Sequence, residues 1–155
     1  MVSEIQHVNE QLRQAFEGDA WHGPAVRELL ADVTATRAVA RPLPGAHSIW
    51  EIVLHMMTWE GVVRRRLRGE TIADLPPDQD WPAVQDTSEA TWRKTIQDLE
   101  RANHALREEI ARAGEERLAE TVPGKGHSVY TMLHGIIQHD LYHAGQVALL
   151  KRALS

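Results

Sequence analysis

Residues 128–150 read SVYTMLHGIIQHDLYHAGQVALL, and this stretch has the spacing of a long helix that begins at Ser128 and reaches about Leu150. At about 100° per residue, one side of that helix collects an apolar stripe interrupted by polar residues. The residues on this side are Met132, Gly135, Ile136, His139, His143, Gln146 and Leu150. Because the stripe is largely apolar, we expect this side to face a protein core, with its two histidines pointing inward.

At the N-terminal end of the chain, residues Glu4–Phe16 have the spacing of a helix. Gly18-Asp19 breaks this run, and Pro24 is predicted to stand at the first position of a second, shorter piece. The inward residues of that piece are predicted to be Val26, Leu29, Leu30 and Val33. The proline-rich segment 41–45 cannot be helical, so we expect a loop there.

A longer helix is predicted to follow this loop. Ser48 and Glu51 form an S-x-x-E capping box, and the helix runs to about Arg68, where Gly69 stops it. Residues 69–86 contain three prolines and no sustained periodicity, which predicts a surface connection. The connection is long for a compact domain, and long loops often have a function.

The remaining long helix is predicted to begin at the Asp86-Thr87-Ser88 cap cluster and to end at Gly114. Segment 123–126 then forms a loop before the last helix, and no stretch alternates with the period of two that marks a strand. The sequence therefore predicts an all-α fold, an antiparallel four-helix bundle with one long crossover connection.

Length, charge and composition narrow the class of protein. A chain of 155 residues suits a single domain, residues 1–155, with a core large enough to fold without a metal or a disulfide. The net charge of −5 disfavours nucleic acid as a partner, and the absence of cysteine removes thiolate metal ligands and thiol nucleophiles. With no apolar run of 18 residues and no signal-like start, we expect a cytoplasmic protein that does not bind membranes.

The two inward histidines of the last helix are candidate metal ligands. His139 and His143 are four residues apart, so their imidazoles project from one face, one turn apart, as a shared metal ion requires. Such pairs also arise by chance, but two buried imidazoles without partners would each cost about 1–3 kcal/mol. His134 points about 140° away from His139 and is excluded as a ligand, being better explained as a surface or interface residue.

A third ligand should come from another helix. His55 lies in mid-helix with Ile52 and Trp59 on its own face, so it also points inward. Alone it would be interpreted as an ordinary core histidine, whereas beside the His139/His143 pair it becomes the best third ligand. An H-E-x-x-H protease site is excluded, because no histidine or acid follows His143; Asp140 is predicted to be exposed or to support a ligand.

These residues carry a family resemblance. Residues 133–146, LHGIIQHDLYHAGQ, resemble the last bundle helix of the DinB-like (YfiT-like) metalloenzyme family, and residues 48–56, SIWEIVLHM, resemble its second helix. Residues 21–24, WHGP, resemble an N-terminal stretch found in some members. The resemblance implies a four-helix bundle, often a homodimer, that binds a divalent metal through His55, His139 and His143. Relatives include thiol transferases and isomerases that use small thiols, and many members have no assigned reaction.

Three neutral imidazoles suit zinc or nickel, with iron and copper as alternatives, and leave at least one coordination position open. Glu51, one turn before His55, is a weak candidate for a catalytic base, a fourth ligand or a ligand-orienting acceptor, and its capping role is favoured. Gln146, one turn after His143, could hydrogen-bond a ligand or simply satisfy a core carbonyl. Tyr142 and Trp59 flank the predicted site and are more often core residues than substrate platforms.

Three functions remain open at this point. The first is a metal-dependent enzyme that acts on a small-molecule substrate, either a hydrolase or a small-thiol transferase. Thiol transfer would need an anion-binding group near the metal, and the arginines of segment 64–68 are the only evident candidates. The second is a non-catalytic metal-binding bundle, a stress-response module or sensor, with a fourth protein ligand. The third is a helical interaction protein whose histidines are plain core residues.

Overall fold

A computed structural model describes all residues 1–155 and is entirely helical apart from its loops and one isolated β-bridge, as the sequence predicts. The four long helices are α1 (Glu4–Glu17), α4 (Ile49–Leu67), α6 (Glu89–Ala113) and α7 (Val129–Ala153). The shorter elements are α2 (Val26–Leu30), α3 (Ala35–Val39), α5 (Pro77–Asp80) and the 3₁₀-helix η1 (Glu115–Ala119). None of these helices has both the length and the apolar character needed to cross a membrane.

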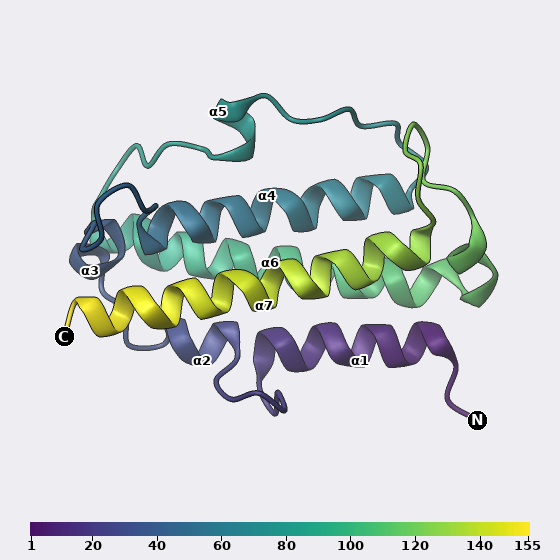
Figure 1. Ribbon diagram of the computed structural model, residues 1–155, viewed down its shortest axis with the longest axis horizontal. Coiled ribbons are helices and arrows are strands. Elements are labelled where there is room, and N and C mark those ends of the chain that lie inside the picture. The colour runs from purple at the N-terminus through teal and green to yellow at the C-terminus, as the bar shows by residue number, and fades with distance from the viewer.

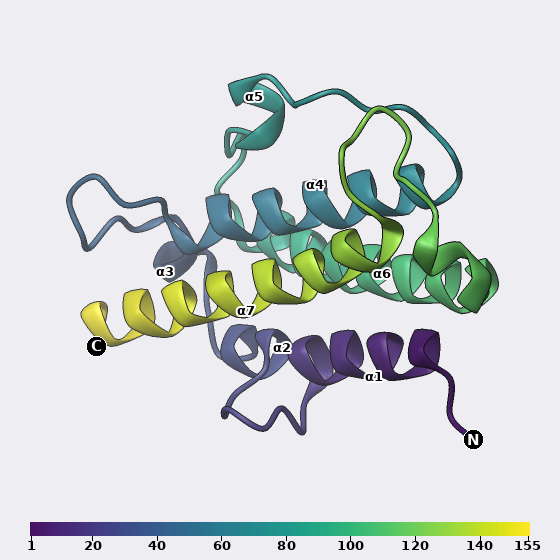
Figure 2. The same cartoon turned by 45° about the vertical axis from the view of Figure 1, so that its right-hand side comes forward.

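The long helices pack side by side as a bundle, with α2 continuing the layer that α1 begins (Figure 1). The crossover between α4 and α6 returns the chain to the end of the bundle where α4 starts, so these two helices run in the same direction (Figure 1). Helices α1 and α7 run the opposite way. The crossover carries α5 and arches over α4, away from α1 and α2 (Figure 2). The predicted four-helix bundle with one long crossover is confirmed.

Local sequence signals fix the helix ends. The Ser48 hydroxyl accepts from the Glu51 amide at 3.2 Å, and the Glu51 carboxylate accepts from the Ser48 amide at 2.7 Å, which completes the predicted capping box. At the starts of α6 and α7, the hydroxyls of Ser88 and Ser128 likewise each accept a hydrogen bond from the backbone amide three residues ahead. Gly114 ends α6 with a φ of 79°, a left-handed conformation that favours glycine.

Three details differ from the sequence prediction. Pro24 is not the first residue of a helix, because α2 begins two residues later and its cap amide, that of Ala25, is satisfied by the Glu28 carboxylate at 2.9 Å. Helices α3 and α5 were not predicted, since four or five residues are too few to show a period. Helix α7 also continues to Ala153, past the predicted end near Leu150.

The apolar core is divided into two clusters with a polar layer between them. One cluster takes α4 from Ile49 to Met56 and α7 from Ala144 to Leu150, and the other takes α4 from Val63 and α7 up to Ile137. Between the two, the helices place buried or half-buried polar residues: His55, Glu60, Asn103, His139, Asp140 and His143. Because buried polar groups stabilise a core less than apolar side chains do unless they are fully hydrogen-bonded, this layer calls for a functional explanation.

Candidate metal centre

Helix α4 contributes His55, which is 6% exposed and lies in the polar layer. Its Nδ1 is 2.7 Å from the backbone carbonyl oxygen of Asp80. A carbonyl can only accept a hydrogen bond, so Nδ1 carries the hydrogen. The lone pair of the neutral ring is therefore on Nε2, which points at the histidines of α7.

Helix α7 contributes His139 and His143 from successive turns, with ring centroids 4.4 Å apart. The Nε2 atoms of His139 and His55 lie 3.0 Å apart. The Nδ1 of His143 donates to the Gln146 side-chain oxygen at 2.7 Å, which leaves its Nε2 free; of the two roles that the sequence allowed, Gln146 therefore takes the hydrogen bond to a ligand. The structure thus brings together all three predicted ligands, with one ligand atom from each within 4.8 Å of the others.

The spacing of these nitrogens fits a single small cation. Bonds of about 2.0–2.1 Å in a tetrahedral site put ligand nitrogens about 3.3 Å apart. The observed group, with a 3.0 Å pair and no separation beyond 4.8 Å, needs ring movements of only about an ångström to reach that geometry. No carboxylate belongs to the group, so the donor set is three imidazoles.

Electrostatics also favour a cation here. His139 Nδ1 is buried without a hydrogen-bond partner, 3.9 Å from the Asp140 carboxyl. The Nε2 atoms of His139 and His55 are within hydrogen-bond distance at 3.0 Å, and a bound cation would take the place of the hydrogen between them. Burial lowers the pKa of His55, and burial also lowers the pKa of His143 to about 4. Both rings are therefore neutral at pH 7, the form that binds metal.

The crossover supplies an aromatic wall that the sequence analysis missed. The Trp81 ring stacks on His55, with centroids 3.8 Å apart and planes within 5°, and on its other face stacks on His47 at 3.6 Å. The Trp59 indole donates to the Asp80 carboxylate at 2.7 Å, which fixes the crossover to α4. The only sequence signal for this wall was the unusual length of the connection.

A pair of buried acids lies behind the histidines. Glu60 and Asp140 are fully buried, and the Asn103 amide donates to Glu60 at 2.9 Å. Burial, reinforced for Glu60 by the neighbouring Asp140, raises the pKa of both carboxyls, so the pair keeps a proton to higher pH than isolated acids do. The prediction that Asp140 is exposed was wrong, and the alternative of a residue supporting a ligand fits its place beside His139. Glu60 lies near the arginines of segment 64–68 in the sequence, but it bonds to Asn103 and to none of them.

Other predicted residues lie at the edge of the centre. Glu51 is held by the capping box and an ion pair with Arg41, outside the three-histidine group. His134 is half-buried against Tyr130 and also lies outside the group, in agreement with its exclusion. Trp59 and Tyr142 flank the histidines as predicted, at 6.1 Å from the His139 ring and 5.2 Å from the His143 ring.

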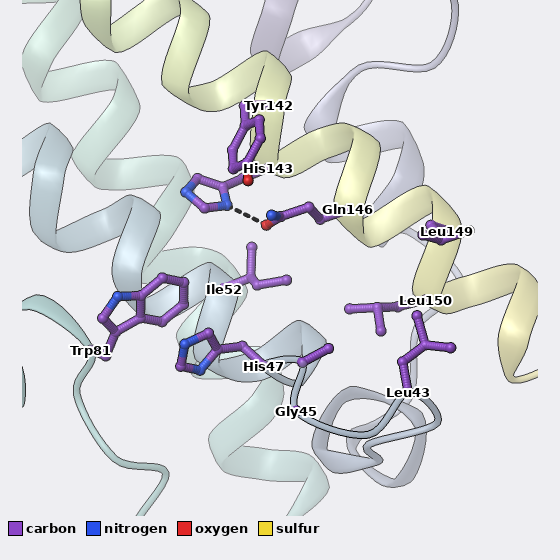
Figure 3. Close-up of a pocket in the computed structure, with 11 residues that line it drawn as sticks. Leu43, Gly45, His47, Ile52, Trp81, Tyr142, His143, Gln146, Leu149 and Leu150 are labelled. Atoms are coloured by element: carbon purple, nitrogen blue, oxygen red, sulfur yellow. Dashed lines mark hydrogen bonds between the residues drawn. The ribbon is translucent and has the colours of Figure 1, made fainter.

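Two separate cavities reach the centre. A cavity of ≈ 440 Å³ opens on the His143 side, where His47, Trp81 and Ile52 form one wall (Figure 3). The opposite wall comes from α7, with Tyr142, Gln146 and Leu150. A second cavity, of ≈ 350 Å³, includes His139 and lies between α4 and α7. The two share no lining residue, so the histidines can be approached from two directions.

Comparison with known families agrees with this geometry. A family model described as the DinB superfamily matches residues 20–147. The chain belongs to the DinB superfamily. The match includes all three histidines, and it confirms the family resemblance seen in the sequence. No curated protein and no solved structure matches this DinB-superfamily chain.

Proposed function

We propose that this DinB-superfamily protein is a metal-dependent enzyme in which His55, His139 and His143 hold one divalent ion, zinc or nickel in the first instance, with iron or copper as alternatives. The observation that carries the proposal is the convergence of three imidazoles with no protein carboxylate in the group. A structural zinc site has four protein ligands, whereas a catalytic one keeps a position for water or substrate.

The reaction class follows from this donor set and from the cavities. When bound, a divalent ion held by three uncharged ligands would supply a nucleophile, either water with a pKa near 7 or a coordinated thiolate. We therefore propose either hydrolysis of an ester, amide or lactone, or transfer of a small thiol to an electrophile. Two cavities that each reach one of the histidines suit a reaction that joins two molecules, which favours the transferase.

The protein residues around the histidines orient them and limit the access of water. The Asp80 carbonyl and the Gln146 side chain each hold one Nδ1–H, which fixes the tautomer in which Nε2 faces the centre. The stacked Trp81 covers one face of the His55 ring. These contacts hold two of the three ligands in place before a metal ion arrives, so less ordering is required on binding.

The alternative is a non-catalytic metal-binding module. Such a site would be closed by a fourth protein ligand, and the group contains only three. A homodimer stays a prediction of the family resemblance, and a cytoplasmic location stays a prediction from the sequence pattern.

The experiment that tests catalysis is a substrate screen with zinc- and nickel-reconstituted protein. The screen uses aryl esters, lactones, and pairs of a small thiol with an electrophile such as 1-chloro-2,4-dinitrobenzene. We expect turnover that chelation abolishes, that added metal restores, and that His143→Ala lacks. Stoichiometric metal without turnover across the whole screen would favour the non-catalytic alternative.

A further inference from the structure

The arginines at the end of α4 have different partners. Arg65 pairs with Glu70 at 2.8 Å, and Arg68 pairs with Glu109 at 2.7 Å. Arg64 lies 3.9 Å from the same Glu109 carboxylate. Arg66 forms no ion pair. Three of these side chains therefore have an acidic partner, and Arg66 does not.

Arg66 is also the buried member of the group, being only 5% exposed. One terminal nitrogen donates to the Ile72 carbonyl at 3.1 Å, and Nε is buried without any partner. The Asp74 carboxylate on the crossover is already bonded to Lys125 at 2.6 Å. Buried charges in proteins are normally paired, so Arg66 lacks an anion that the chain itself does not provide.

The unpaired guanidinium lines the ≈ 350 Å³ cavity that also contains His139. The α4 lining residues run from Trp59 to Arg66 and the α7 lining residues run from Thr131 to His139, each spanning about 10–12 Å of helix. Because α4 and α7 are antiparallel, His139 and Trp59 lie at one end and the backbone of Arg66 lies at the other. The Arg66 side chain folds back along α4, and its Cζ is 5.8 Å from the Trp59 ring centroid.

The rest of the lining is suited to a small organic molecule. Trp59, Val63, Met132 and Ile136 supply apolar surface, and His127 and Thr131 supply polar groups near Arg66. A Cβ added at Gly135 would meet nothing within 4 Å, so this glycine leaves room in the cavity wall. The volume lies at the small end of the range for ligand pockets.

We propose that this cavity binds a small organic carboxylate, with the carboxylate on Arg66, the apolar body against Trp59 and Ile136, and the reacting end at His139. A carboxylate is favoured over a phosphate because Arg66 is the single cation of the lining, and one guanidinium matches a monoanion in charge and in its two-pronged geometry. The inference rests on the proposed function for the reacting end only. The contact with Arg66 requires no metal.

The test measures binding to metal-free and zinc-loaded protein by calorimetry. The probes are phenylacetate, 3-phenylpropionate and 4-phenylbutyrate, each paired with its uncharged amide. We expect at least one acid to bind metal-free protein about tenfold or more tightly than its amide, since hydrogen bonds to charged groups are the stronger ones. Arg66→Met should remove this preference, whereas Arg65→Met, at an exposed and paired position, should keep it.

A second pair of variants tests whether binding depends on the cavity itself and not only on a fold that Arg66→Met could damage. Gly135→Leu places a side chain in the cavity and leaves Arg66 unchanged, so it should abolish binding of the acid. Gly61→Leu is the matched control: this helical glycine has as much free space but lies outside the cavity, so its substitution should leave binding of the acid intact. Equal affinity for acid and amide, no binding of any acid, or wild-type binding by Gly135→Leu would overturn the inference. If zinc fails to bind while the preference through Arg66 persists, the proposed function fails and the carboxylate site stands.

Discussion

Stability of the metal-free protein should depend on pH through His143. This ring is 3% exposed, and burial lowers its pKa from 6.5 to about 4. In the unfolded chain His143 takes up a proton below pH 6.5, whereas in the folded chain it stays neutral down to about pH 4. The folded state therefore loses stability as the pH falls through this window, because the unfolded state binds the extra proton.

The size of the effect follows from the two pKa values. At about 1.4 kcal/mol per pH unit, the difference between 6.5 and about 4 corresponds to about 3 kcal/mol in full. Between pH 7.5 and pH 5.0, where most surface carboxylates stay ionised, about 2 kcal/mol of this should be lost.

The assay is urea unfolding of chelator-treated protein at these two pH values. His143→Asn keeps an N–H donor near Gln146 but cannot be protonated, so its free energy of unfolding should fall by about 2 kcal/mol less than that of the wild type over the same interval. His104→Asn, at an exposed position on α6, is the matched control and should behave as the wild type does. If His143→Asn and the wild type lose equal stability, the buried neutral histidine is not what the structure indicates.

Three further predictions concern the polar layer, the crossover and the core. Glu60→Gln should make the free energy of unfolding less dependent on pH above 4.5, because burial raises the pKa of Glu60 above that value and the wild type loses stability as the pH rises from 4.5 through the raised pKa; urea titrations at pH 4.5 and pH 8 measure this. Asp80→Ala, which frees the Trp59 indole, should weaken zinc binding by about 10–100-fold in a competition assay with a chromogenic chelator. Leu106→Ala, at a fully buried position remote from the histidines, should cost about 2–5 kcal/mol in urea unfolding and leave the zinc stoichiometry unchanged.

The parts of the fold that could be predicted from the sequence are those with local causes. Ser48, Ser88 and Ser128 start helices by bonding to amides three residues ahead, and Gly114 ends one in a left-handed conformation. Such signals depend on a few neighbouring residues, so they are visible without a structure. The same holds for His139 and His143, whose common face follows from helical geometry alone.

The parts that escaped prediction depend on how distant segments dock. Asp80 and Trp81 lie in a stretch without periodicity, and only the path of the crossover brings them onto His55. Glu60 lies four residues before a run of arginines, and a surface ion pair was the natural interpretation of that neighbourhood. Its burial follows from the packing of α4 against α6, which places it beside Asn103.

The polar layer explains why a bundle of this size gives up apolar packing at its centre. Unpartnered buried groups such as the Asp140 carboxyl oxygens destabilise a core, so their presence indicates a role other than stability. The layer contains two neutral histidines and a third histidine beside a carboxyl pair, and cavities reach it from two sides. This composition is compatible with binding of a cation.

The most direct test of the account is the metal content of chelator-washed and then reconstituted protein, measured by elemental analysis. Wild-type protein should hold about one divalent ion per chain, and His55→Ala, His139→Ala and His143→Ala should each lose it while remaining folded. His134→Ala, on the same helix but outside the group, should bind as the wild type does. A wild type that binds no metal, or binding that is indifferent to His55, would contradict the three-histidine centre.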